Sequence, residues 1–274
     1  MNGKLEGGVA VITGAGSGIG RALATILAQE KMSLALADVD VSGLEETARS
    51  LAGARTRVST HVVNVADPDA MRRFAEEVAK HQGRASLLIN NAGVALLGRF
   101  EELSLEEMDW VMRINFWGVV HGVKAFLPLL RREQHAHIVN VSSILGIIAS
   151  AGDPAYCASK FAIRGFSEVL GQELKDTGVK VSCVYPGRIH TPFSNRARIA
   201  EGAAARLSGR SQTGSVERKS VLSPEAAARR IVQGIKKGQT RILIGTDAAW
   251  ADRLQRMFPG SYQKVIWSLS KLRP

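Results

Sequence analysis

The sequence has 274 residues, 45% of them hydrophobic and 22% charged, which is the composition of a folded globular protein and not of a disordered one. Lys and Arg number 36 against 25 Asp and Glu, so the formal net charge is +11. This charge does not by itself indicate a nucleic-acid partner, because no DNA- or RNA-binding motif accompanies it and aromatic residues make up only 5% of the chain.

The cysteines, histidines and apolar runs predict a cytoplasmic protein without a metal site. Cys157 and Cys183 are too far apart in the sequence to indicate a disulfide framework or a zinc site. His135 and His137 flank one alanine just before an apolar run, and we interpret them as surface-loop residues. No segment approaches the roughly 18 to 20 apolar residues of a membrane span, and the first residues do not have the pattern of a signal peptide.

Short apolar runs alternate with longer amphipathic segments along the first 245 residues. Most runs are continuously apolar and several are rich in Val and Ile, as are strands buried on both faces. They cover residues 9–13, 34–37, 58–63, 87–90, 137–142, 179–185 and 241–245. The segments between them have helical patterns, including one long helix over about 104–131. The order predicts a single α/β domain over 1–245, a Rossmann-like, doubly wound parallel sheet of about seven strands with helices on both faces.

The first strand is followed by a glycine-rich turn and a helix in the segment VAVITGAGSGIGRALA. Gly14, Gly18 and Gly20 allow a ligand to approach the main chain closely. The helix that begins there offers free N–H groups and the positive end of its dipole, which suits a pyrophosphate. A strand, this turn, a helix and then an acid at the end of the next strand together predict a dinucleotide site.

The acid is Asp38, about twenty residues after the turn. A carboxylate there can accept hydrogen bonds from the adenosine ribose hydroxyls, and it repels a 2′-phosphate. At an effective dielectric constant of ~20 and a separation of ~4 Å, like charges repel by about 4 kcal/mol, and half of that is more than tenfold in affinity. Ser17 in the turn and Val39 after the acid supply no compensating cation. The sequence therefore predicts NAD and not NADP.

Six motifs follow one another in an order and spacing that resemble the short-chain dehydrogenases/reductases. They are TGAGSGIG, NNAG at 90–93, Asn115, SS at 142–143, YCASK at 156–160 and PGRIHT at 186–191. The resemblance runs from about residue 6 to 192 and, less specifically, to about 245. It implies that Tyr156 transfers a proton, that Lys160 activates Tyr156, and that Ser143, thirteen residues before the tyrosine, binds the substrate oxygen. Asn115 would hold a water that links Lys160 to solvent.

The resemblance also implies which residues line the cofactor and the substrate. Asn64 stands where many family members have Asp, but an amide can still bond to the adenine edge. The implied cofactor residues are Gly14, Ser17, Gly18, Ile19, Gly20, Asp38, Val39, Asn64, Val65, Asn91, Ala92, Gly93, Tyr156, Lys160, Pro186, Gly187, Ile189 and Thr191. The implied substrate residues are Ser143, Leu145, Tyr156 and Phe193, together with Ile147, Ala149, Ala151 and a lid.

Tyr156 and Lys160 are four residues apart, so on a helix they lie one above the other on the same face. A free tyrosine has a pKa near 10 and is a poor base at pH 7. An ammonium within ~4 to 6 Å favours the phenolate, and we expect it to lower the pKa of Tyr156. Cys157 adjoins the tyrosine but points elsewhere, and we interpret it as a packing residue.

Two segments depart from the strand–helix alternation. Residues 190–222 are polar and rich in Arg, Ser, Ala and Gly, and we expect a substrate lid there. Their arginines are interpreted as a solvated mobile face, and binding of an anionic group such as the phosphates of a coenzyme A thioester is the alternative. Residues 246–274 form an amphipathic C-terminal extension that we expect to dock on its own core or on a second subunit. Docking on a membrane surface is the alternative.

The sequence therefore predicts an NAD-dependent oxidoreductase that interconverts a hydrophobic secondary alcohol and its ketone, with Tyr156 as general acid/base. An interfacial lipid or acyl-CoA-type 3-hydroxyacyl/3-oxoacyl oxidoreductase is one alternative. An NAD-binding scaffold or sensor without turnover is another. By analogy with the family we expect a homodimer or homotetramer in which the helices around 104–131 and 154–176 pack across a twofold axis.

Overall fold

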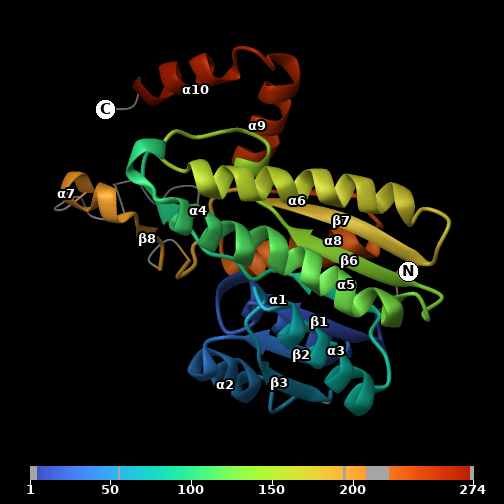
Figure 1. Cartoon of the computed structure of the whole chain (residues 1–274). Coiled ribbons are helices and arrows are strands. Elements are labelled where there is room, and N and C mark those ends of the chain that lie inside the picture. The colour runs from blue at the N-terminus through green and yellow to red at the C-terminus, as the bar shows by residue number, and fades with distance from the viewer. Residues whose placement is uncertain (1–4, 55, 194–195, 208–221, 272–274) are drawn as a thin grey trace.

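A seven-stranded sheet runs through the centre of the protein (Figure 1). The computed structural model describes residues 5–54, 56–193, 196–207 and 222–271. The sheet strands are β1 (Val9–Thr13), β2 (Ser33–Asp38), β3 (Val58–Val62), β4 (Leu87–Asn90), β6 (Ala136–Val141), β7 (Val179–Pro186) and β9 (Arg241–Ile244). Their order is β3-β2-β1-β4-β6-β7-β9, and every pairing is parallel. The predicted strands are confirmed to within two residues at each end.

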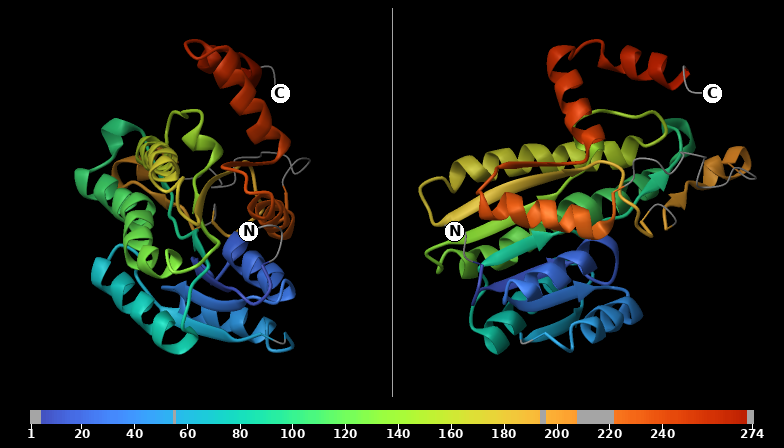
Figure 2. Two further views of the ribbon diagram at one scale, coloured as in Figure 1. Left: turned by 90° about the vertical axis from the view of Figure 1, so that its right-hand side faces the viewer. Right: turned by 180° about the vertical axis from the view of Figure 1, so that it is seen from behind.

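Helices cover both faces of the sheet, as Figure 2 shows, which confirms the predicted fold class. One apolar core lies on the side of α1 (Gly18–Gln29), α2 (Val41–Ser50) and α8 (Pro224–Lys236). The other lies on the side of α3 (Pro68–Gln82), α5 (Gly118–Leu130) and α6 (Pro154–Glu173). Two covered faces explain why the strand sequences are apolar without alternation.

The chain order creates a switch point between β1 and β4. After β1, the next strands β2 and β3 are added on one side of it. The chain then returns to β4, on the other side of β1, and adds β6, β7 and β9 in the opposite direction. Helices leave β1 and β4 on opposite faces, so a crevice opens beyond the carboxyl ends of these two strands. In open parallel sheets this crevice is where ligands bind.

The long helix predicted over 104–131 is interrupted. The structure has α4 (Leu105–Met112), a π-helical turn η2 (Arg113–Trp117) and then α5. The start is fixed by reciprocal bonds, because Glu107 N donates to Ser104 Oγ at 3.1 Å and Ser104 N donates to the Glu107 carboxylate at 2.9 Å. A π turn inserts one extra residue without changing the apolar pattern enough to be read from sequence.

The described part of the predicted lid has regular structure. Strand β8 (Arg198–Ile199) pairs in parallel with β5 (Leu96–Leu97), and it is followed by η4 (Glu201–Ala203) and α7 (Ala204–Leu207). A small apolar core joins this segment to α4 and to the start of α6, with Leu96, Val111, Ala155, Ala200 and Ala203 buried. Residues 194–195 and 208–221 of the predicted lid lie outside the described residues.

Three of the lid arginines, which are interpreted from the sequence as a solvated mobile face, have partners within the chain. Arg196 forms an ion pair with Asp40 at 3.2 Å, and Arg206 pairs with Glu102 through two bonds. The guanidinium of Arg198 lies 4.0 Å from the centre of the Trp110 ring. Partners far away in the sequence supply these contacts, so composition could not reveal them. Arg210, Arg218 and Lys219 lie outside the described residues.

The C-terminal extension docks on the protein's own sheet edge. Helix α9 (Thr246–Met257) buries Ala248, Ala251 and Leu254, and Asp252 receives a bond of 2.6 Å from Arg241 on β9. Helix α10 (Tyr262–Lys271) turns back over the body (Figure 1). Among the described residues, no helix is both long and apolar enough to cross a membrane.

His137 is not a surface-loop residue as predicted. It lies in β6, is buried at 1% exposure, and its Nε2 is 2.7 Å from Ser182 Oγ. Burial lowers its pKa to about 3, because a charged imidazole is poorly solvated in the core. No cluster of His, Cys, Asp or Glu in the described part of the chain could hold a metal ion.

The aromatic pair Phe74–Phe126 anchors α3 to α5. The ring centres are 5.1 Å apart in an edge-to-face arrangement, and Phe126 is fully buried. We expect Phe126→Ala to lower the free energy of unfolding by about 3–5 kcal/mol, through lost burial and the cavity that is left. Urea denaturation measures this, with Phe100→Ala, at 72% exposure, as the control. Equal losses in the two variants would contradict the packing described.

Candidate active site

The glycine turn after β1 is fastened to the end of β4. Asn91 donates through Nδ2 to Thr13 O at 3.0 Å and to Gly14 O at 3.1 Å, while its backbone N–H donates to Thr13 Oγ1 at 3.0 Å. Gly14 has φ +66°, which favours glycine, and a Cβ on Gly20 would collide with Gly14 O. Two of the predicted motifs therefore build one rigid turn at the switch point.

The start of α1 fits a dinucleotide phosphate. Ser17 is the N-cap residue and makes no side-chain cap hydrogen bond, so its side chain does not occupy the first N–H groups of the helix. Thr191 faces this turn from the other side, since a Cβ on Gly18 would lie 3.2 Å from its Cγ2. Ile189 packs against the apolar core beside α1. The residues present thus form the cradle that a pyrophosphate needs.

Asp38 lies at the end of β2 beside the same turn. Gly16 N donates to its Oδ2 at 2.8 Å and Asp40 N donates to its Oδ1 at 3.0 Å. Two fixed donors hold the carboxylate in place at the position predicted for ribose recognition. Val39 is exposed at 63%. The nearby Arg196–Asp40 pair was missed by sequence reasoning, because 156 residues separate the two.

The residues after β3 and β4 line the opposite side of the crevice. Asn64 is exposed and accepts a bond from Ala66 N at 3.0 Å, while Val65 is buried against Gly118. Gly93 lies beside the candidate catalytic residues, since an added Cβ would be 3.1 Å from Asn115 Oδ1 and 3.5 Å from Lys160 Nζ. Ala92 is half-buried between these groups.

The two adjacent serines have different roles in the structure. Ser142 is buried and its hydroxyl donates to Lys160 O at 2.8 Å, which ties the end of β6 to α6. The Ser143 hydroxyl lies close enough to Tyr156 to lower the pKa of the phenol. It also caps the short turn η3 (Ile144–Gly146) by accepting from Leu145 N at 3.1 Å. This geometry favours Ser143 as the candidate catalytic serine.

Helix α6 carries Tyr156 and Lys160 on one face, as the spacing predicts. Lys160 is 3% exposed, its Nζ donates to Val141 O at 3.1 Å, and it lies 5.4 Å from the centre of the Tyr156 ring. Phe193 approaches the same ring from the lid, with the ring centres 5.9 Å apart. The phenol therefore lies between the serine, the ammonium and an apolar side chain. Cys157 is buried, as expected for a packing residue.

The expectation that Lys160 lowers the pKa of Tyr156 is wrong for the protein alone. Burial raises the pKa of Tyr156 to about 12, and the Ser143 hydrogen bond opposes this only in part. Burial also lowers the pKa of Lys160 to about 8. The sequence spacing brings the two groups together, but it cannot show how strongly burial acts on the pKa of each.

Asn115 is held in the π-helical turn and is completely buried. Its Oδ1 accepts from Val94 N at 2.8 Å, and its Nδ2 donates to Val94 O at 3.0 Å and to Ser159 Oγ at 3.0 Å. Ser159 donates in turn to Tyr156 O at 2.7 Å. Sequence reasoning missed Ser159, although it lies within the YCASK motif. The amide thus connects the end of β4 to the helix that carries the tyrosine.

The loop after β7 is fixed by a residue of the C-terminal extension. Arg188 N donates to Asp247 Oδ2 at 2.8 Å, and Gly187 N donates to Ile244 O at 2.9 Å. A Cβ on Gly187 would collide with the Asp247 carboxylate. Pro186 ends β7 at this point. Sequence reasoning did not identify Asp247, because it lies outside the motifs of the resemblance.

These residues are those of one enzyme family. The family model described as short chain dehydrogenase matches residues 8–202. The chain is 42% identical over 266 residues to SadH of Mycobacterium tuberculosis, with 96% of this chain and 95% of that protein covered. It is 32% identical over 266 residues to estradiol 17-beta-dehydrogenase 11 of Homo sapiens, with 96% and 83% covered. The chain belongs to the short-chain dehydrogenase family of oxidoreductases.

Solved structures of this family share the fold. A short-chain dehydrogenase/reductase from Burkholderia phymatum in complex with NAD has a TM-score of 0.84 at 29% identity, with 93% of this chain and 95% of that chain covered. An alcohol dehydrogenase from Thermococcus sibiricus complexed with 5-hydroxy-NADP has a TM-score of 0.75 at 26% identity, with 87% and 96% covered. Because one neighbour holds NAD and the other an NADP derivative, the comparison does not separate the two cofactors.

Asp153, at the start of α6, raises the pKa of Tyr156 through its negative charge. We expect Asp153→Asn to lower the pKa of Tyr156, so the rising limb of kcat/KM against pH in the oxidation direction should move to lower pH by roughly half a unit. The pH profile of the variant measures this. Asp176→Asn, which removes an exposed carboxylate beyond α6, is the control. A shift to higher pH would contradict the assignment.

Proposed function

We propose that the protein is an NAD-dependent oxidoreductase that interconverts a hydrophobic secondary alcohol and its ketone. The observation that carries the proposal is the arrangement of Ser143, Tyr156 and Lys160 beside the glycine turn of a dinucleotide crevice. A scaffold or sensor that only binds NAD would have no need of this set. Turnover assays over a panel of alcohols and ketones separate the two functions.

The proposed mechanism assigns a separate task to each side chain. The nicotinamide ring, when bound, supplies the acceptor or donor of the hydride. Tyr156 removes the hydroxyl proton during oxidation and donates one to the carbonyl during reduction. The Ser143 hydroxyl donates to the substrate oxygen and stabilises its developing charge. Lys160 Nζ lies 5.4 Å from the centre of the Tyr156 ring and would favour the phenolate only together with the positive charge of a bound, oxidised nicotinamide. Asn115 holds the backbone around both groups.

The principal test of the mechanism is Tyr156→Phe, which removes the acid/base group and keeps the ring. We expect turnover to fall by several orders of magnitude, because no side chain then removes the hydroxyl proton of the substrate. Cofactor affinity should remain within a few-fold of the original value. Steady-state kinetics and a fluorescence titration with the cofactor measure both quantities. Full activity in this variant would end the mechanism.

We propose that Asp38 makes the enzyme prefer NAD over NADP by more than tenfold in affinity, since its carboxylate repels a 2′-phosphate. Asp38→Ala should weaken NAD binding and narrow the preference. Titration of both cofactors measures this, with Glu45→Ala as a control that removes an exposed carboxylate of α2. NADP binding as tight as NAD in the unmodified protein would refute the assignment.

The proposed substrate class follows from the side chains around Ser143. Leu145 is half-buried, and the centre of the Phe193 ring lies 5.9 Å from that of the Tyr156 ring. Ile147, predicted to line the substrate, is instead buried in the core with Val119 and Ile163. The name of the human relative, a dehydrogenase of the 17β position of estradiol, also supports an apolar secondary alcohol. The acyl-CoA alternative relies on cations in the lid, and the described ones have partners within the chain. That alternative and docking on a membrane surface remain predictions.

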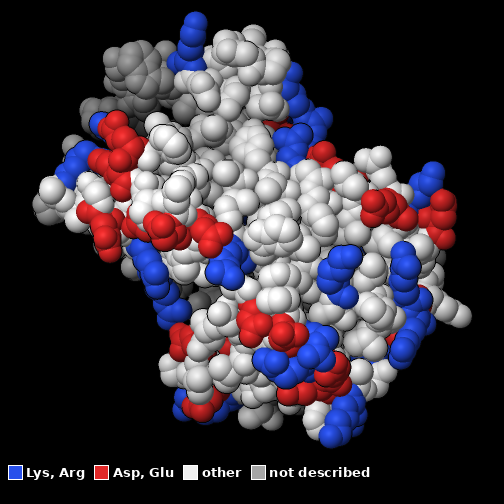
Figure 3. Space-filling model, in the orientation of Figure 1, with Lys and Arg blue, Asp and Glu red and all other residues white. Residues whose placement is uncertain are grey.

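We also propose that the protein is a homo-oligomer. The surface over α5 and α6 carries few charged side chains (Figure 3). Trp117, directly before α5, and Phe161 and Val169 on α6 are exposed at 47%, 37% and 53%. Apolar side chains of this size in one region are typical of an interface between subunits. Sedimentation analysis measures the assembly.

A further inference from the structure

The C-terminal extension contacts both loops that border the candidate active site. At its start, Asp247 accepts a hydrogen bond from Arg188 N at 2.8 Å and so holds the loop after β7. Helix α9 then contacts η3, the turn that begins directly after Ser143. In α10, the Tyr262 hydroxyl accepts a hydrogen bond from Ala149 N at 3.1 Å. The extension therefore connects the predicted cofactor loop to the predicted substrate loop.

The apolar side of α10 is turned toward the substrate loop. Tyr262, Val265 and Ile266 occupy positions i, i+3 and i+4, which lie on one side of a helix. All three are half-buried, whereas Gln263 and Lys264 are exposed. Because the Tyr262 hydroxyl bonds to Ala149 N, the first turn of this side lies beside the loop that follows η3.

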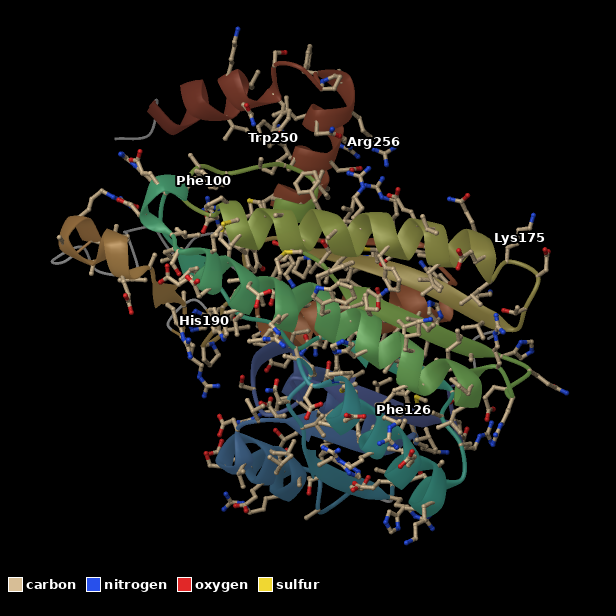
Figure 4. All side chains as sticks on the ribbon, in the orientation of Figure 1. Phe100, Phe126, Lys175, His190, Trp250 and Arg256 are labelled. Carbon is tan, nitrogen blue, oxygen red and sulfur yellow. The ribbon has the colours of Figure 1, made fainter. Side chains whose placement is uncertain are left out.

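Helix α9 contributes an aromatic side chain to the same space. Trp250 is 46% exposed, and Figure 4 shows it on the side of α9 that faces α10, with Arg256 on the other side. The buried residues Ala248, Ala251 and Leu254 attach α9 to the body. Neighbouring residues thus hold Trp250 and the apolar side of α10 in place, while the apolar side chains themselves remain partly exposed.

We infer that the apolar surface formed by Trp250, Tyr262, Val265 and Ile266 continues the substrate site and binds the long apolar part of the alcohol or ketone. This inference rests on the proposed function. The argument for the substrate as occupant is continuity, because the loop that Tyr262 contacts begins at Ser143 and includes the half-buried apolar residue Leu145. A small alcohol would contact the serine and the tyrosine but would not extend to α10.

Oxidation of butan-2-ol and octan-2-ol with NAD tests the inference. Each buried methylene contributes a factor of about four in binding, so we expect the unmodified enzyme to have at least a tenfold higher kcat/KM for octan-2-ol. In Trp250→Ala and Val265→Ser this ratio should fall about tenfold. Met257→Ala, at 71% exposure on the same helix, is the matched control and should retain the ratio. An unchanged ratio in both surface variants would overturn the inference.

Direct binding separates this inference from the proposed reaction. Calorimetric titration with octan-2-one should give about tenfold weaker binding in Trp250→Ala than in Met257→Ala. If no alcohol or ketone is turned over but this difference is seen, the proposed function fails and the surface assignment stands. If turnover is seen and the titrations are equal, the surface assignment fails. A third outcome is equal binding of octan-2-one together with a change in vesicle binding or in self-association in Trp250→Ala. It would show that a lipid surface or a second copy of the chain occupies this surface, and it would also overturn the inference.

Discussion

A lysine ammonium loses its hydration when it is buried, which costs free energy unless fixed hydrogen-bond acceptors replace the lost water. Lys160 is 3% exposed, and its Nζ donates to Val141 O at the end of β6. The Ser142 hydroxyl binds the backbone of the same residue. These two bonds fix α6 against the carboxyl end of the sheet, so Tyr156 and Ser143 are brought together by the restraint on a single lysine. The candidate site thus depends on where this one cation is held.

Burial favours the uncharged form of both Tyr156 and Lys160. It raises the pKa of Tyr156 to about 12 and lowers the pKa of Lys160 to about 8. A neutral phenol beside a weakly basic amine is suited to donate a proton. To accept one, the phenol needs a further positive charge nearby, and an oxidised nicotinamide carries such a charge. The protonation state of the pair is therefore expected to follow what occupies the crevice.

Contacts between distant segments shape the crevice as much as its motifs do. Asn91 bonds the glycine turn to the end of β4, and Arg196 forms an ion pair with Asp40. Asp247 accepts a hydrogen bond from the loop after β7. Each contact joins chain segments from different parts of the fold. The C-terminal extension consequently contacts loops beside the candidate site, although it lies beyond the motifs that identify the family.

The sequence by itself determined the strands, the sheet type and the glycine turn, because local periodicity and motif spacing encode them directly. The candidate catalytic set came from the resemblance to the family. It also separated Ser143 from Ser142 through the resemblance. Only the tertiary structure decided the pKa directions, the π turn at Asn115, the buried position of His137 and the partners of the lid arginines. The physical reason is that solvation and ion pairing depend on which distant segments lie side by side, and neither property is recorded in the order of neighbouring residues.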